Sequence, residues 1–201
     1  MPAVGGFVFD SSGAPADREV RIYRRDTGAL LGKTRSSGGG GDPHFENVSL
    51  LLHMDGAEGS TVFVDQIGAE CLPVGDARIS TARGVYGGSS LLLDGSLDGL
   101  RINHSSAMNF GTNDFTVEML VYVTAHTNTI PALLSSGGSS WSTGECILRF
   151  DAGGVIGLYT NGDGICVGTV AFPVGQWRHV AMCRASGFVS VYLHGISVAS
   201  E

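Results

Sequence analysis

The sequence has no long apolar run, no excess of basic residues and no closely spaced cysteines. No stretch approaches the ~18 consecutive apolar residues that a membrane-spanning helix needs. Lysine and arginine number 12 against 19 acidic residues, for a net charge of −7, and this balance lacks the clustered positive charge that nucleic-acid binding requires. The first six residues, MPAVGG, show no basic stretch followed by an apolar one, so we expect no secretory signal. We therefore expect neither a nucleic-acid nor a membrane partner.

The cysteines are few and widely spaced. Cys71, Cys146, Cys166 and Cys183 form no C-x-x-C motif, and reduced, buried thiols are the default for such a chain. A disulfide between Cys146 and Cys166 is the alternative, because both lie in expected strands of one meander. No cysteine–histidine pair has the spacing of a zinc site.

Glycine is abundant and helical periodicity is nearly absent. Thirty-one glycines against six prolines indicate many tight turns, and strand patterns recur about every ten residues. The longest, residues 115–123, alternates apolar with more polar side chains. The fold class expected is all-β, an antiparallel β-sandwich of jelly-roll type with a short N-terminal β-arm. The expected strands are 6–10, 19–24, 30–34, 48–54, 61–64, 89–93, 99–102, 115–123, 132–134, 146–150, 155–159, 165–170, 177–183, 188–193 and 196–199.

Four consecutive glycines, residues 38–41, interrupt the strand pattern. Glycine has no side chain to pack and no preferred φ, so this composition is typical of a linker. We expect an N-terminal β-arm at residues 1–37, a linker at 38–47 and a jelly-roll at 48–201.

Several motifs after the linker occur in a characteristic order. In that order they resemble the laminin-G-like, concanavalin A-like jelly-roll domains of bacteriophage structural proteins. The resemblance implies a sandwich that continues for one or two strands beyond residue 199. The motifs are LLLHMDG (50–56), GGSSLLLDG (87–95), FGTNDFTVE (110–118), WRHVA (177–181) and VYLHG (191–195).

The segment before the glycines resembles the opening strands of a carboxypeptidase-regulatory-like sandwich. About three strands are too few to close a sandwich, so we expect an arm rather than a domain. Three arrangements stay open. The arm folds back and supplies missing strands, it pairs with a neighbouring subunit by strand addition, or it is an unpaired remnant of a fusion.

No catalytic residues are expected. Glycosidases that share this jelly-roll carry a Glu-x-Asp-x-x-Glu strand motif with paired carboxylates, and no glutamate here has an aspartate two positions later. A G-x-S-x-G nucleophile elbow is also missing, as are phosphate-binding glycine motifs.

Two kinds of binding residue are candidates. The stretch Asp94-Gly-Ser-Leu-Asp98-Gly begins like a Ca²⁺ loop, although Asp-Gly is also ordinary turn chemistry. The resemblance implies a Ca²⁺ at the sandwich rim, for which Asp98 and Asp114 are the candidates by position; no other cofactor is expected. For a glycan, whose rings stack on aromatic faces, the contact candidates are Trp141, Tyr159 and Asn161, and a plug closing the sandwich rim is the alternative role of Trp141.

The resemblance implies a non-enzymatic virion structural protein, in a tail, fibre or head decoration. The expected partners are other virion proteins and further copies of the chain, and the expected location is the virion, assembled in the host cytoplasm. The alternative is a carbohydrate-binding, lectin-like module that recognises a host-surface glycan. A remnant hydrolase is the third hypothesis, which the missing carboxylate motif disfavours.

Overall fold

The computed structural model describes residues 3–6, 19–23, 30–35, 47–85, 87–103, 113–126, 130–136, 146–160 and 163–201. The secondary-structure elements in this part of the chain are all β-strands, which confirms the expected all-β class. None of the described residues forms a helix long and apolar enough to cross a membrane. The strands are β1 (Ala3–Gly6), β2 (Glu19–Tyr23), β3 (Leu30–Arg35), β4 (Cys71–Val74), β5 (Arg78–Ser80), β6 (Ser90–Leu92), β7 (Gly99–Ile102), β8 (Phe115–Val123), β9 (Ala132–Ser135), β10 (Cys146–Phe150), β11 (Val155–Thr160), β12 (Asp163–Ala171), β13 (Trp177–Ala185), β14 (Phe188–Leu193) and β15 (Ile196–Ser200).

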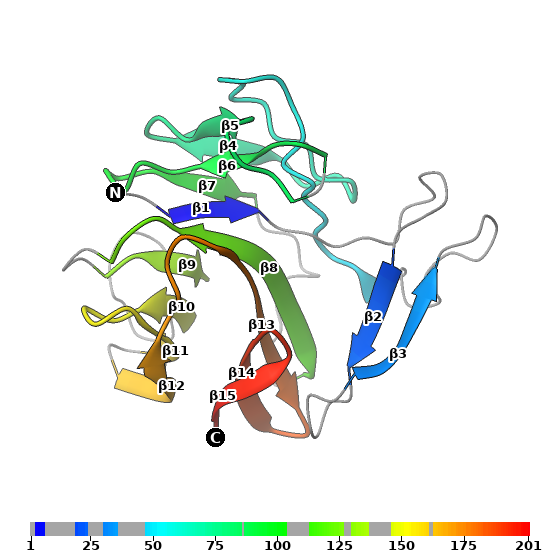
Figure 1. Cartoon of the computed structure of the whole chain (residues 1–201), viewed down its shortest axis with the longest axis vertical. Coiled ribbons are helices and arrows are strands. Elements are labelled where there is room, and N and C mark those ends of the chain that lie inside the picture. The colour runs from blue at the N-terminus through cyan, green and yellow to red at the C-terminus, as the bar shows by residue number, and fades with distance from the viewer. Residues whose placement is uncertain are drawn as a thin grey trace.

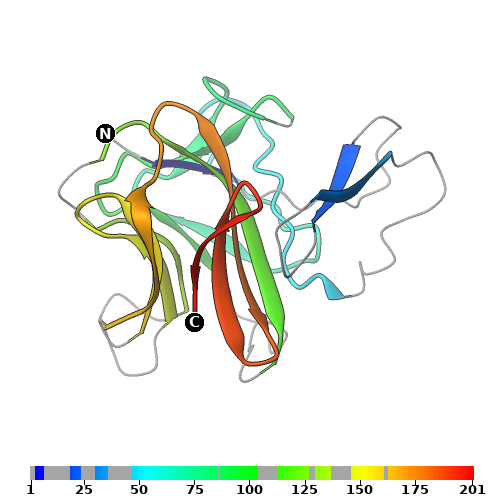
Figure 2. The ribbon, with the colours of Figure 1, turned by 60° about the horizontal axis from the view of Figure 1, so that its bottom comes forward.

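Two antiparallel sheets form the sandwich. The larger has seven strands in the order β15-β14-β13-β8-β1-β6-β5, and the smaller has four in the order β12-β11-β10-β9. Figure 2 shows the four-stranded sheet facing the β8, β13, β14 and β15 side of the larger sheet. Two further pairs, β2 with β3 and β4 with β7, are separate two-stranded sheets.

Side-chain alternation in β8 and β13, both in the seven-stranded sheet, gives that sheet an apolar face on which the four-stranded sheet packs. Met119 and Val121 of β8 are 3% and 0% exposed, and they pair with Val180 and Arg178 of β13. Since successive strand residues point to opposite faces, Glu118 of β8 lies on the face away from the core. The core between the sheets also takes Leu148, Phe150, Ile156, Leu158 and Phe172 from the other side of the sandwich.

The first strand, β1, lies inside the larger sheet rather than at its edge (Figure 1). Val4 pairs with Leu92 of β6 on one side and with Tyr122 of β8 on the other. This is the arrangement in which the N-terminal segment folds back onto its own jelly-roll. The strand expected at residues 6–10 falls mostly outside the described residues, and the strand observed ends at Gly6.

Two expected strands are wrong. Residues 48–54 and 61–64 form no strand; they are joined by one isolated bridge between Leu52 and Asp65. Leu51 and Leu52 are nonetheless fully buried. Their segment is held by a side chain, because the Asp65 carboxylate accepts the Leu51 N–H at 2.6 Å. Residues 48–54 are apolar because the segment is buried, although it does not pair in a sheet. This apolar run therefore resembled a strand in the sequence.

Two observed strands were not expected. β4 includes Pro73 and has three exposed residues out of four, a pattern that shows neither alternation nor burial. β5 is only three residues long. The other strands from β6 to β15 lie where the sequence pattern predicted them, with ends shifted by at most two residues.

Cys71, Cys166 and Cys183 form no disulfide. Cys166 is 2% exposed in the core, and burial raises the pKa of its thiol. Its strand, β12, is separated from Cys146 on β10 by the intervening β11. The disulfide alternative between Cys146 and Cys166 is therefore wrong. Cys71 and Cys183 form no disulfide either, but they are only partly buried, so the expected buried thiol is found at Cys166 alone among these three.

Candidate functional site

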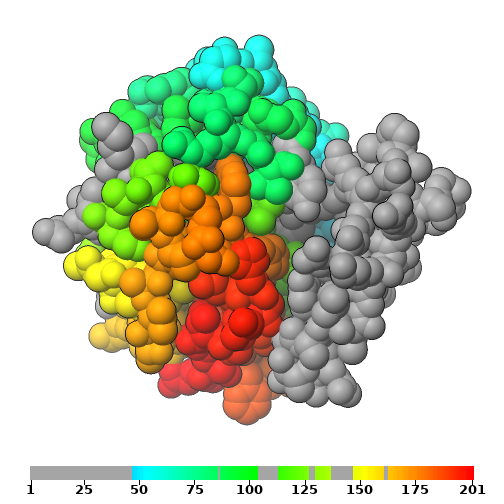
Figure 3. Space-filling model, viewed as in Figure 1, coloured from blue at the N-terminus to red at the C-terminus, as the bar shows by residue number. Residues whose placement is uncertain are grey.

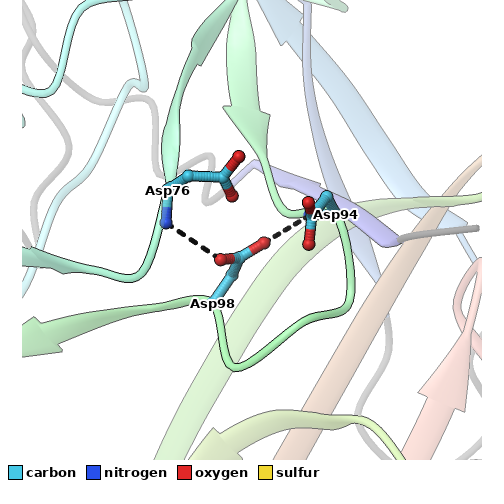
Figure 4. A group of neighbouring side chains, drawn as sticks. All are labelled: Asp76, Asp94 and Asp98. Carbon is cyan, nitrogen blue, oxygen red and sulfur yellow. Dashed lines mark hydrogen bonds between the residues drawn. The ribbon is translucent and has the colours of Figure 1, made fainter.

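Three carboxylates converge at one rim of the sandwich. Asp76 comes from the turn between β4 and β5, and Asp94 and Asp98 come from the loop between β6 and β7. One carboxylate oxygen from each residue lies within 4.8 Å of the other two. Figure 4 shows Asp98 between the other two residues. This rim carboxylate group is the only cluster of potential metal-ligating side chains among the described residues.

Backbone hydrogen bonds fix Asp98 in the rim carboxylate group. Its two oxygens accept the N–H groups of Asp76, at 3.0 Å, and of Asp94, at 2.6 Å (Figure 4). Gly75 makes this approach feasible, because a Cβ on Gly75 would overlap an Asp98 oxygen. Gly75 also adopts φ = +66°, a conformation that glycine tolerates best.

Within the rim carboxylate group, the pKa values of Asp98 and Asp94 are shifted in opposite directions. Burial opposes ionisation of Asp98, but the hydrogen bonds from Asp76 and Asp94 outweigh it and hold the Asp98 pKa below its usual value. Asp94 lies beside it, and the side-chain hydrogen bond with Asp98 raises the Asp94 pKa. Arg78 partly neutralises the group, since its Nη1 donates to the Asp76 carboxylate at 2.7 Å. The group therefore carries an excess of negative charge at neutral pH.

This donor set fits a hard cation such as Ca²⁺, which takes carboxylate and carbonyl oxygens as ligands. Asp76 and Asp94 are exposed, so their carboxylates are accessible from solvent. Turn chemistry is present in the same loop, because Asp94 Oδ1 accepts the Ser96 N–H at 2.8 Å. The loop from Asp94 to Asp98 is thus a hydrogen-bonded turn that also presents carboxylates.

The structure separates the two metal candidates that the sequence indicated. Asp98 belongs to the rim carboxylate group, whereas Asp114 does not. Asp114 instead accepts the Ser186 N–H at 2.8 Å, which secures the turn between β13 and β14. Sequence reasoning missed Asp76. No local spacing links it to Asp94, and the Gly-Asp turn that carries it follows β4, a strand without a clear sequence pattern.

Tyr159, a predicted glycan contact, lies on β11 and is 8% exposed. Arg149, on the neighbouring strand β10 and paired with Gly157, is equally buried, and its guanidinium carbon lies 3.6 Å from the centroid of the Tyr159 ring. The guanidinium therefore covers one ring face that a sugar would need. Arg149 was not identified from the sequence as a neighbour of Tyr159. The other two predicted contacts, Trp141 and Asn161, lie outside the described residues.

The outward face of the larger sheet carries a second polar group. His179 Nε2 lies 3.7 Å from a Glu118 oxygen, and nearby Trp177 packs edge-on against Tyr122 at 5.7 Å between ring centroids. Arg83 lies over the Tyr122 ring, with its guanidinium carbon 4.7 Å from the ring centroid. These contacts place His179 among packed side chains on the outward face of the larger sheet.

The acidic residues of the sandwich strands do not pair with each other. Among the described strands of the two sandwich sheets, the acids are Glu118 on β8 and Asp163 on β12, which belong to different sheets. Elsewhere, carboxylates bind backbone N–H groups: Asp65 with Leu51, Glu58 with Thr81, and Asp151 with Gly153 and Val155. These carboxylates organise loops.

Comparison with known families decides the relationship of the chain. The family model of the concanavalin A-like lectin/glucanases superfamily matches residues 94–201. The chain belongs to this superfamily. The matched span holds β7 to β15, and so all of the four-stranded sheet, together with Asp94 and Asp98; Asp76 lies before it. Searches of curated proteins and of solved structures found no match.

Proposed function

We propose that this chain is a non-catalytic, lectin-like module that binds a glycan at the sandwich rim with the help of a divalent cation. The observation that carries the proposal is the placement of the carboxylates. Glycoside hydrolysis canonically uses two carboxylates that flank the scissile bond, whereas Glu118 lies on the face of the larger sheet away from the four-stranded sheet that carries Asp163. The carboxylates that do converge lie at the solvent-exposed rim.

The residues of the rim have distinct roles in this proposal. Asp98 is fixed by two backbone N–H groups and sets the position of the group. Asp76 and Asp94 are exposed and would hold the cation with Asp98. A bound Ca²⁺ would supply a positive centre for the hydroxyl oxygens of a sugar, since it accepts more oxygen ligands than three carboxylates provide.

Thermal unfolding with Ca²⁺ or EDTA tests the cation. A ligand that binds only the folded state raises its stability, so we expect a higher Tm in Ca²⁺ for the wild type and no response for Asp94→Asn. Without Ca²⁺, Asp94→Asn should raise the Tm, because the pKa of Asp94 is raised by Asp98 and its ionised form is disfavoured. Asp163→Asn removes an exposed acid of β12, outside the rim carboxylate group, and is the matched control. A wild-type melt identical in Ca²⁺ and EDTA would exclude the cation.

Glycan binding is tested separately, on an array of surface polysaccharides and oligosaccharides with and without Ca²⁺. Loss of binding on EDTA treatment and in Asp94→Asn supports the rim site. Trp141→Ala tests the contact predicted from sequence, and binding unchanged by that substitution contradicts it. A Ca²⁺-dependent Tm together with no glycan bound would retain the cation and reject the lectin-like function.

The second candidate function is a structural role in a bacteriophage particle, in contact with other virion proteins. Exposed apolar side chains favour it. β12 packs across β15, where Gly168 lies against the Val198 carbonyl oxygen, and Figure 3 shows both strands at one surface. On these strands Val170 and Ile196 are 74% and 68% exposed, and exposed apolar residues that lie together mark interaction surfaces.

Light scattering of the full chain tests this second candidate. We expect a solution mass above that of one chain, and a return to the monomer mass in Val170→Asp. Val62→Asp, at a residue 67% exposed outside β12 and β15, should leave the mass unchanged. A monomeric wild type at high concentration contradicts the structural role.

A further inference from the structure

The larger sheet contains a slot that is one strand wide. β6 and β8 do not pair with each other, and β1 lies between them (Figure 1). Gly5 pairs with Leu91 on one side and with Val121 on the other. β1 thus completes two ladders at once, although it is only four residues long.

The strands that border the slot belong to the core. Leu91 of β6 is 3% exposed, and Val121 and Val123 of β8 are 0% and 4% exposed. Removal of β1 would leave two unpaired rows of backbone N–H and C=O groups beside these residues. Buried backbone groups without partners are costly, and open strand edges attract another strand. The folded sheet therefore requires an occupant in this slot.

The occupant is held mainly by its backbone. β1 has the sequence Ala-Val-Gly-Gly, so two of its four residues have no side chain. The next strand, β2, pairs only with β3 and not with the sandwich. Residues 7–46 lie between β1 and the jelly-roll, and the effective concentration of a tethered strand at its own slot falls as its connection lengthens. The β1 of another copy would make the same ladder contacts in the same slot.

We propose that β1 exchanges between copies of this chain, so that the slot between β6 and β8 of one copy accepts Ala3–Gly6 of a second copy. Reciprocal exchange closes a two-fold dimer without any new interface chemistry. The balance between the closed monomer and the exchanged dimer depends on protein concentration relative to the effective concentration of the tethered strand. This inference does not depend on glycan binding, and it involves residues other than Val170 and Ile196.

Two single-cysteine variants of the full chain test the exchange. Val4 and Leu92 are directly opposite in the ladder, at a separation that a disulfide can span. Val4→Cys and Leu92→Cys chains are mixed at high and low concentration, oxidised, and separated without reductant. We expect a Val4–Leu92 cross-linked dimer that increases with concentration. Because Leu97 is 93% exposed in a loop, Leu97→Cys replaces Leu92→Cys as the mismatched control, with wild-type chain as the control for the native thiols.

The chain that carries both substitutions completes the experiment. If it forms an intramolecular disulfide while the mixture forms no cross-link at any concentration, β1 stays in its own chain and the exchange is rejected. If neither sample forms the Val4–Leu92 bond, β1 does not occupy the slot, and the exchange is rejected too. A doubled solution mass without this bond locates the dimer contact elsewhere, and would support the β12–β15 surface instead.

Discussion

Ser89 donates its hydroxyl hydrogen bond to the main-chain carbonyl of Met54 at 2.9 Å, with both residues at most 5% exposed. This bond joins two of the motifs singled out from the sequence, LLLHMDG (50–56) and GGSSLLLDG (87–95). Met54 adopts φ = +57°, so the chain turns sharply where the serine holds it. In the same region Gly87 lies so close to the Asp55 carboxylate that no Cβ would fit. These motif residues therefore stabilise a chain reversal.

Ser89→Ala should lower the free energy of unfolding. The substitution leaves the buried Met54 carbonyl without this donor, at a cost of about 1–3 kcal/mol. Urea unfolding measures the change. Ser190→Ala is the control, since its hydroxyl bonds to Ser200 at an exposed position, and it should change stability by less than about 0.5 kcal/mol. Equal effects of the two substitutions would show that the Met54 contact adds no stability.

Asp65→Ala should destabilise more strongly. The carboxylate is 6% exposed and accepts the N–H groups of Leu51, at 2.6 Å, and Ala69, at 2.7 Å. Its loss leaves two donors without partners, each at a cost of about 1–3 kcal/mol. Asp65→Asn retains one acceptor oxygen and should recover part of the loss. Chemical denaturation of the three proteins gives the order, and an Asp65→Asn variant less stable than Asp65→Ala would contradict this role.

Two glycines with nearly the same backbone conformation separate strain from steric overlap. Gly154 and Gly175 have φ of +78° and +77°. A Cβ at Gly154 would overlap the His126 ring, whereas none of the described atoms lies within 4 Å of a Cβ at Gly175. Gly175→Ala should cost about 1–2 kcal/mol, the penalty of the left-handed conformation, and Gly154→Ala should cost more.

His126 provides the control for that comparison. Its Nε2 is 2.6 Å from the Phe172 carbonyl oxygen, which places the ring over Gly154. In a His126→Ala background the extra cost of Gly154→Ala should disappear in thermal unfolding. If the extra cost persists, the overlap with the ring is not its cause.

Acid should weaken the fold through Glu58. The Glu58 carboxylate accepts from the backbone N–H of Thr81, and also from the Thr81 and Ser80 hydroxyls. The first of these bonds is the main reason that the pKa of Glu58 is lowered from 4.5. A lowered folded-state pKa stabilises the fold above the unfolded value, and this stabilisation is lost as pH falls from about 4.5 through the lower folded pKa.

Unfolding by urea between pH 7 and pH 3 measures this loss. Glu58→Gln should be less stable than the wild type at neutral pH and should converge with it in acid. Thr81→Val keeps the backbone donor and removes only the hydroxyl, so its pH dependence should lie between the two. A constant difference between wild type and Glu58→Gln over the whole range would show that ionisation of Glu58 does not matter.

Local pattern was sufficient for most of the sandwich. The alternation in residues 115–123 and 177–183 predicted β8 and β13, because every second side chain of a strand enters the core whatever lies beyond it. Turn glycines between short apolar runs similarly delimited β10, β11 and β14. The all-β class and the superfamily followed from these repeated local signals and from the order of the motifs.

Only tertiary structure decided the remaining features. Residues 48–54 are as apolar as a strand, yet the Asp65 side chain holds them in place of a ladder. Asp76 joins Asp94 and Asp98 because two separate turns meet, and Arg149 covers Tyr159 because β10 pairs with β11. The sequence alone determined where β6 to β15 form, since their patterns depend on neighbours along the chain. Which loops meet, which ring is covered and where β1 inserts depend on residues distant in sequence, and are settled only when the sheets pack.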